Sequence, residues 1–189
     1  MESRQYTLFV PESHFDCSLT NFDWSGKNAL RDMVKDLVNG KRERGLVLIG
    51  NPGVGKTHLL VGIFRDLLDK GKVLGTDILF LEFQKFVQDT IDKMKLGVLP
   101  ENVVNDLMAK ILIVDDARSC WSGRMWGDIL KRIIEKSYEE SNVLLMSANA
   151  DTIDDLAKVW CLEDYWLSRL VAISDVVLMK GKDRRVKND

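Results

Sequence analysis

Residues 50–57 read GNPGVGKT, and this octapeptide constrains the fold more than any other part of the chain. It follows the apolar run LVLI at 46–49 and precedes a segment with helical patterning. The pattern GxxxxGK[ST] between a strand and a helix is typical of a loop that wraps around phosphate groups. Glycine is needed because the backbone must curl with its N–H groups pointing inward, at dihedral angles that a Cβ would hinder. A glycine turn that only feeds a helix is the alternative.

This loop predicts a nucleotide site for ATP and Mg²⁺. Lys56 is expected to reach the β- and γ-phosphates as a point charge, from a solvent-facing position when no phosphate is bound. The Thr57 hydroxyl is expected to bind magnesium. The residues predicted to contact the nucleotide are Gly50, Asn51, Pro52, Gly53, Val54, Gly55, Lys56, Thr57 and His58.

Short apolar runs alternate with helical patterns after Gly45. The alternation predicts five strands separated by helices, which indicates a parallel α/β sheet. Runs without polar alternation fit strands that are covered on both faces. The five runs lie at 46–49, 77–82, 111–114, 142–147 and 173–179, and a first helix is expected at 28–39.

The chain of 189 residues is 46% hydrophobic, which is enough for a single core. We expect an N-terminal arm at 1–27, an ATPase core at 28–180 and a basic tail at 181–189. The formal charge of −2 provides no overall basic field, so binding of DNA would need a local patch. The N-terminus lacks the pattern of a signal peptide, and no stretch approaches the length of a membrane span. These features predict a cytoplasmic protein without membrane contact.

Cysteines and histidines are few. The three cysteines, Cys17, Cys120 and Cys161, do not combine with each other or with the two histidines in the spacing of a zinc site. We therefore expect reduced thiols and no zinc.

Two acidic residues end the run at 111–114. Asp115 and Asp116 would emerge from a buried parallel strand at the edge where open α/β sheets bind their ligands. Asp115 is expected to hold magnesium, and Asp116 to polarise the water that attacks the γ-phosphate. An aspartate is a shorter base than a glutamate, so turnover is expected to be slow. A turn or helix cap is the alternative for this pair.

The run at 142–147 ends in the polar residues Ser147 and Asn149. An amide can both donate and accept hydrogen bonds, which suits the orientation of water against phosphate oxygens. We expect Asn149 to act in this way. In the alternative, Asn149 and Asp151 form a turn and cap the next helix.

Four segments together resemble the AAA+ ATPases: GVGKTHLL at 53–60, VDDA at 114–117, SANAD at 147–151 and WLSRL at 166–170. Within that class they are most similar to helicase loaders of the DnaC and DnaI type, with the transposon ATPase IstB as a near relative. The resemblance implies a P-loop NTPase of the AAA+/ASCE type with strand order 5-1-4-3-2 and helices on both faces. It also implies little or no C-terminal lid, and places the strand before Asn149 between the two phosphate-binding strands.

The resemblance assigns further roles. Asn149 corresponds to the sensor 1 amide, and Arg169 to an arginine finger that reaches the ATP of a neighbouring subunit, which implies an ATP-dependent homo-oligomer. The alternative for Arg169 is a surface arginine that pairs with Glu163 or Asp164. Arg184 or Arg185 could stand in for sensor 2.

Segment 83–96 lies between the phosphate-binding loop at 50–57 and the acidic pair Asp115 and Asp116. At this place, loaders and initiators insert a helix that contacts single-stranded DNA. Lys85, Lys93 and Lys95 offer charge, and Phe86 offers a ring that could stack on a base. The apolar residues of this segment are also spaced like the core face of a helix, so packing is the alternative.

Three functions remain open from the sequence. The leading one is a DNA-replication helicase loader that hydrolyses ATP, binds single-stranded DNA and acts on a replicative helicase. Full-length loaders carry a helicase-binding domain before the arm, and few residues precede Phe22 here. The second is an IstB-like regulator of transposition on duplex DNA. The third is a nucleotide-gated protein adaptor with little hydrolysis.

Overall fold

The computed structural model describes residues 10, 12–71, 73–105, 107, 109–117 and 124–183. The strands are β1 (Gly45–Ile49), β2 (Ile78–Glu82), β3 (Ile111–Asp115), β4 (Val143–Ala148) and β5 (Ser174–Leu178). The helices are α1 (Asn28–Val38), α2 (Lys56–Asp69), α3 (Phe83–Lys95), α4 (Pro100–Asn105), α5 (Arg124–Glu139), α6 (Ile153–Trp160) and α7 (Asp164–Ile173), with a 3₁₀ helix η1 at Glu12–His14. Each apolar run of the sequence forms the expected strand.

The five strands form one parallel sheet in the order β2-β3-β4-β1-β5. This order confirms the predicted 5-1-4-3-2 arrangement, counted from the opposite edge, and β4 lies between β1 and β3. In the register, Leu48 lies opposite Ser147, and Glu82 lies opposite Asp115. The loops after β1, β3 and β4 therefore open at the same edge, which is where ligands bind in sheets of this kind.

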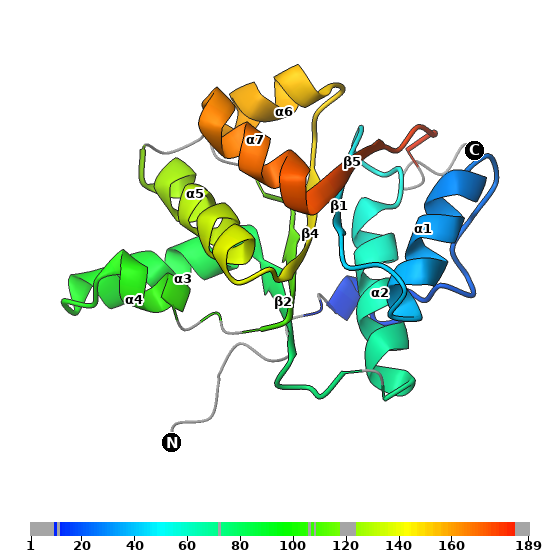
Figure 1. The fold of residues 1–189 in the computed structure, drawn as a ribbon, viewed down its shortest axis with the longest axis horizontal. Helices are drawn as coiled ribbons and strands as arrows, with labels where there is room; N and C mark the ends of the chain where they lie inside the picture. The colour runs from blue at the N-terminus through cyan, green and yellow to red at the C-terminus, as the bar shows by residue number, and fades with distance from the viewer. Residues whose placement is uncertain are drawn as a thin grey trace.

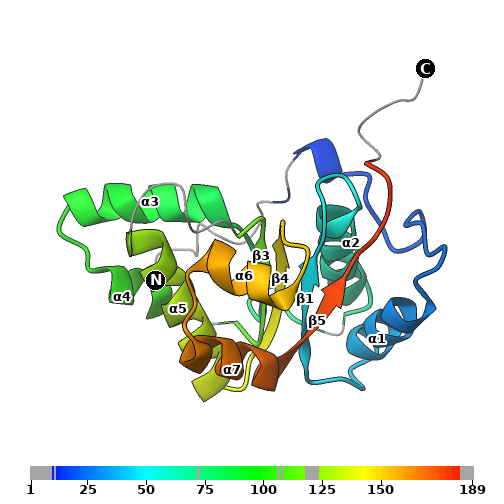
Figure 2. The same cartoon turned by 90° about the horizontal axis from the view of Figure 1, so that it is seen from above.

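Helices cover both faces of the sheet. Alternate residues of a strand point to opposite faces, so Leu46 and Leu48 pack in the cluster with α1 and α2, whereas Val47 and Ile49 pack in the cluster with α3 to α7. Figure 1 shows these two layers on either side of the strands, and Figure 2 shows the same division from above. Both faces are buried, as the continuous apolar runs predict.

The described part of the N-terminal arm packs on α2. Gly62 leaves room for it, since a Cβ there would come within 3.0 Å of the backbone nitrogen and Cδ2 of Leu19. The Phe22 ring is buried in the cluster of α1 and α2. The arm is thus part of the packed domain, and the boundary between residues 27 and 28 stays a prediction.

Two arginines before β1 hold the edge strand β5. Arg42 and Arg44 both form ion pairs with Asp175 of β5. Arg44 also donates hydrogen bonds to the carbonyl oxygens of Val171 and Ala172, at 2.8 and 2.6 Å. These carbonyls lie in the last turn of α7, where helical partners are lacking, so Arg44 satisfies them.

Trp160 links α6 to the loop after β3. Its side chain is fully buried, and its indole Nε1 donates a hydrogen bond of 2.7 Å to the carbonyl oxygen of Ala117. Ala117 follows the acidic pair, so this bond fixes the chain just beyond the predicted magnesium ligand.

Among the described residues, no helix is long and apolar enough to cross a membrane. After β5, residues 179–183 contain no helix, and the expectation of little or no C-terminal lid stays a prediction.

Candidate functional site

The loop between β1 and α2 has the backbone that its glycines predict. Gly50, Gly53 and Gly55 have φ angles of 143°, 78° and 100°, in the region that side chains rarely adopt. A Cβ on Gly50 would overlap the carbonyl oxygen of Met179. A Cβ on Gly55 would lie 3.2 Å from the Phe22 ring. The loop therefore excludes side chains at these positions, both by its dihedral angles and by its neighbours.

Lys56 is buried, with 8% of its surface exposed, although the sequence led us to expect a solvent-facing side chain. Its Nζ donates hydrogen bonds to the carbonyl oxygens of Gly50 and Asn51, at 2.7 and 2.9 Å, and to Oδ1 of Asn149, at 2.8 Å. The expectation was wrong because the curled loop and β4 provide three acceptors for the three ammonium protons. A phosphate oxygen that binds Lys56 would replace some of these acceptors.

The two acidic residues at the end of β3 differ in their surroundings. Asp115 is 3% exposed, and its Oδ1 accepts hydrogen bonds from the hydroxyls of Thr57, at 3.1 Å, and Ser147, at 2.5 Å. Asp116 has a φ of 51°, and its backbone N–H donates to the Ser147 hydroxyl at 2.9 Å. The acids are therefore not equivalent: Asp115 is fixed in the interior, whereas Asp116 lies half-buried at the turn.

The pKa of Asp115 is raised above the ordinary range of a carboxyl group, mainly because burial disfavours the charged form. Hydrogen bonds from Ser147 and Thr57 lower the pKa, and the negative charge of Asp116 raises it further. Burial has the largest effect, so the net shift of the pKa is upward although the charge of His14 also lowers the pKa. A bound cation would reverse this balance.

These groups meet in one cleft of about 370 Å³, which is within the size range of small-molecule sites. The cleft is lined by Ser13, His14, Cys17, Pro52, Gly53, Gly55, Lys56, Thr57, His58, Glu82, Asp115, Asp116, Ser147 and Asn149. Residues from β2, β3, β4 and the loop after β1 thus come together at the carboxyl edge of the sheet. Of the predicted nucleotide contacts, Gly50, Asn51 and Val54 shape the loop without lining the cleft.

Several lining residues were not assigned from the sequence. Glu82 ends the apolar run of β2 as Asp115 ends that of β3, and this parallel is the signal that could have found it. Ser147 was noticed only as a polar residue at the end of a strand. Ser13, His14 and Cys17 come from the N-terminal arm, and no local pattern in the sequence predicts that the arm returns to the cleft.

His58 joins the phosphate-binding loop to the arm. Its Nε2 lies 2.8 Å from Oδ1 of Asn21 and 3.1 Å from the carbonyl oxygen of Ser18. The ring also meets Phe22 edge to face, with 5.4 Å between the centroids. His58 therefore packs beside the loop as well as lining the cleft.

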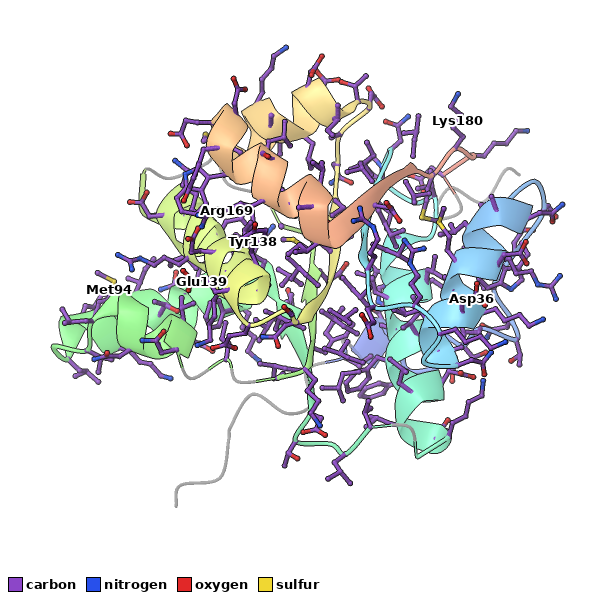
Figure 3. All side chains as sticks on the ribbon, viewed as in Figure 1. Asp36, Met94, Tyr138, Glu139, Arg169 and Lys180 are labelled. Carbon is purple, nitrogen blue, oxygen red and sulfur yellow. The ribbon has the colours of Figure 1, made fainter. Side chains whose placement is uncertain are left out.

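Arg169 lies on α7 and does not line the cleft. It forms an ion pair with Glu135 of α5, and its guanidinium carbon lies 4.2 Å from the ring centroid of Tyr165 and 5.1 Å from that of Tyr138. Figure 3 shows Arg169 and Tyr138 together where α7 crosses α5. The sequence suggested a pairing with Glu163 or Asp164, which is wrong because Arg169 pairs with Glu135. Glu163 pairs with Lys131 instead. Whether Arg169 reaches a neighbouring subunit stays a prediction.

The predicted nucleic-acid residues separate into two groups. Phe86 is 3% exposed and packs in the core, so it offers no ring for stacking in this structure. The expectation of a stacking ring is corrected because the apolar face of α3 points at the sheet. Lys85 is exposed on the same helix. Arg184, Arg185 and Cys120 lie outside the described residues.

The cleft fits a nucleotide with magnesium. The loop holds Lys56 at acceptors that phosphate oxygens can replace. Thr57 and Asp115 present a hydroxyl and a carboxylate 3.1 Å apart, and oxygen is the donor that magnesium prefers. Lys56, Thr57, Asp115 and Asn149 would hold the phosphates and the ion.

Comparison with known proteins identifies the family. The family model described as IstB-like ATP binding protein matches residues 14–189. The chain belongs to the IstB-like ATP-binding proteins. Across 99% of its length it is 25% identical to the ATP-binding protein of insertion sequence IS21 from Pseudomonas aeruginosa, and it covers 70% of that protein. It is also similar to the uncharacterized protein YqaM of Bacillus subtilis (strain 168), 26% identical over 74% of this chain and 47% of YqaM.

The fold of this IstB-like protein is that of the DnaC helicase loader. The DnaC structure superposes with a TM-score of 0.76 at 19% identity, covering 90% of this chain and 100% of the DnaC chain. The similarity in sequence is too low to carry more than the fold. It confirms the AAA+ arrangement that the sequence motifs suggested.

The buried Asp115 leads to a prediction about stability without nucleotide. Between the ordinary carboxyl pKa and the higher pKa of Asp115, the folded state binds more protons than the unfolded state, so the free energy of unfolding falls as pH rises. Asp115→Asn keeps an Oδ1 acceptor for Thr57 and Ser147 but carries no charge. We expect this variant of the IstB-like protein to be more stable than the wild type at neutral pH, by a margin that shrinks on acidification.

Urea unfolding over a pH series measures this difference, with Asp151→Asn, an exposed aspartate outside the cleft, as the control. A wild type that is more stable than Asp115→Asn at neutral pH would contradict the role of burial.

Proposed function

We propose that this IstB-like protein is a magnesium-dependent ATPase that uses ATP as a switch for assembly on DNA. The observation that carries the proposal is the convergence of Lys56, Thr57, Asp115, Asp116 and Asn149 in one cleft at the carboxyl edge of the sheet. Phosphoryl transfer to water requires a cation that binds the phosphates, and a hydroxyl and a carboxylate that hold a metal. It also requires a second carboxylate and an amide.

In this proposal Lys56 and the loop N–H groups bind the phosphates. Thr57 and Asp115 would hold magnesium, which would neutralise phosphate charge. Asp116 accepts a proton from a water molecule as the water oxygen bonds to the γ-phosphorus. The bond between that phosphorus and the β–γ bridging oxygen breaks, and ADP leaves with the electron pair. In the structure, Oδ1 of Asn149 accepts a hydrogen bond from Lys56. When Lys56 binds phosphate instead, the Asn149 amide becomes available to orient the water.

The role of Asp116 is tested by Asp116→Asn. The amide keeps the shape of the side chain but is a poor proton acceptor, so hydrolysis should fall by about 10²-fold or more, while ATP affinity stays within about twofold. Steady-state phosphate release and equilibrium binding of a fluorescent ATP analogue measure the two properties. Asp151→Asn, outside the cleft, is the control. Equal loss of magnesium-dependent binding would make Asp116 a metal ligand instead, and a wild type without turnover would favour the adaptor with little hydrolysis.

We propose duplex DNA as the nucleic acid, in line with the IstB-like alternative of the sequence analysis. The sequence of the chain matches the IstB-like family over most of its length, whereas the likeness to the DnaC loader is one of fold alone. The buried Phe86 also removes the ring that would have stacked on single-stranded bases. We therefore place the IstB-like role in transposition ahead of the helicase-loader role, which remains the second candidate because of the shared fold.

With ATP bound, the protein is expected to bind duplex DNA more tightly than a single strand of the same sequence, with a steep salt dependence. Lys85 is exposed on α3, and Lys85→Ala should reduce the slope of log affinity against log salt by about one. Lys158→Ala, exposed on α6, is the control. Fluorescence anisotropy measures both. Tighter binding to the single strand would return the helicase-loader role to first place.

The trans role of Arg169 leads to a mixing experiment. If α7 supplies an arginine to the neighbour's ATP, activity should rise more than linearly with protein concentration, and Arg169→Ala should lose that rise. Arginine fingers raise the rate of hydrolysis by about 10³- to 10⁵-fold where they dominate. Because Asp116 is a shorter base than a glutamate, we expect only part of that increase here. Arg169→Ala and Lys56→Ala chains, each inactive, should recover activity when mixed, because one supplies the ATP site and the other the arginine. Mixtures no more active than the separate variants would assign Arg169 to the packing of α7 on α5.

A further inference from the structure

Ser147, near the end of β4, contacts both acidic residues through a single hydroxyl. The hydroxyl donates to Oδ1 of Asp115 at 2.5 Å and accepts from the backbone N–H of Asp116 at 2.9 Å. The carbonyl oxygen of Ser147 also accepts from the N–H of Ala117, at 2.9 Å. Ser147 is 1% exposed, and its bond to Asp115 is buried, whereas its bond to the half-buried Asp116 is partly buried. One residue of β4 thus contacts three consecutive residues at the end of β3.

These bonds restrain each acid in a different way. Oδ1 of Asp115 is shared between the Ser147 and Thr57 hydroxyls, which fixes the carboxylate against rotation. Asp116 has a left-handed backbone, which is strained for a residue with a Cβ, and the bond from its N–H to Ser147 offsets part of that strain. Without the hydroxyl, the metal-binding carboxylate would gain freedom and the turn that carries Asp116 would lose its anchor.

Ser147 lies in β4, and Asn149 follows two residues later, just beyond the end of the strand. Asn149 contacts Lys56 of the phosphate-binding loop, and Ser147 contacts the acids of β3. The end of β4 therefore connects the phosphate side of the cleft with its metal side.

We propose that Ser147 is a positioning residue that orients Asp115 toward magnesium and Asp116 toward the attacking water. This inference rests on the ATPase proposed for the cleft. Ser147 acts through the two carboxylates and does not itself touch the nucleotide. Hydrogen-bond partners of this kind typically change metal affinity or activity by about 10- to 100-fold when they are removed.

Ser174 offers a matched control because it is an equally buried serine outside the cleft. It is 1% exposed, and its hydroxyl donates to the carbonyl oxygen of Leu170 at 2.6 Å. Ser147→Ala and Ser174→Ala each remove one buried hydroxyl from a strand. A difference between them in nucleotide or magnesium binding therefore reports on position and not on the loss of a hydrogen bond as such.

The experiment measures equilibrium binding of a fluorescent ATP analogue, first with EDTA and then over a magnesium titration, and single-turnover hydrolysis. For Ser147→Ala we expect binding in EDTA within about twofold of the wild type, a half-saturating magnesium concentration raised about 10- to 100-fold, and hydrolysis reduced by a similar factor. Ser174→Ala should match the wild type in all three measurements. Ser147→Thr retains the hydroxyl and should restore the magnesium dependence.

The inference is overturned if Ser147→Ala has the magnesium dependence of Ser174→Ala, or if a folded Ser147→Thr fails to restore it. Should Ser147→Ala not fold, Ser147→Cys keeps the size of the side chain with a weaker donor, and an unchanged magnesium dependence in that variant overturns the inference equally. A wild type that binds no nucleotide under any condition would instead remove the proposed ATPase function, which is a different outcome from failure at Ser147.

Discussion

The pairing of β4 between β1 and β3 is the constraint on which the cleft depends. Neighbouring parallel strands lie about 4.8 Å apart, so a side chain at the end of β4 can reach the loop after β1 on one side and the end of β3 on the other. Asn149 contacts Lys56 in the first direction, and Ser147 contacts Asp115 in the second. If the pairing slipped by one residue, these side chains would turn away from their partners.

Lys56 and Asp115 are charged side chains that are buried in the cleft and hydrogen-bonded to uncharged groups. Lys56 is bonded to carbonyl and amide oxygens, and Asp115 accepts from two hydroxyls. Neutral partners stabilise a buried charge less than an opposite charge would, and the raised pKa of Asp115 reflects this. The nucleotide-free protein is therefore less stable than it would be with uncharged side chains here, but the same charges favour the binding of nucleotide and metal. A loss of stability of this kind is common at functional sites.

Local patterns in the sequence predicted the strands and the residues of the phosphate-binding loop. The order followed from a resemblance, whereas the strands followed from apolar runs that both faces of the sheet bury. The burial of Lys56 could not be predicted, because its acceptors include Asn149, which is remote in the sequence. The same holds for the pairing of Arg169 with Glu135, which depends on how α7 crosses α5, and for the return of His14 to the cleft. Contacts between distant segments carry no periodic signal.

The ion pairs of Arg42 and Arg44 with Asp175 affect how copies of the chain can meet. β5 is an edge strand, and an edge strand exposes backbone groups to which another strand can add. Here the strand has five residues, its second residue carries a charge, and arginine side chains from before β1 lie against it. Short, charged edges oppose the addition of strands. Growth of the sheet from one molecule into the next is therefore disfavoured at this edge, so an assembly of copies would have to form through other surfaces of the molecule.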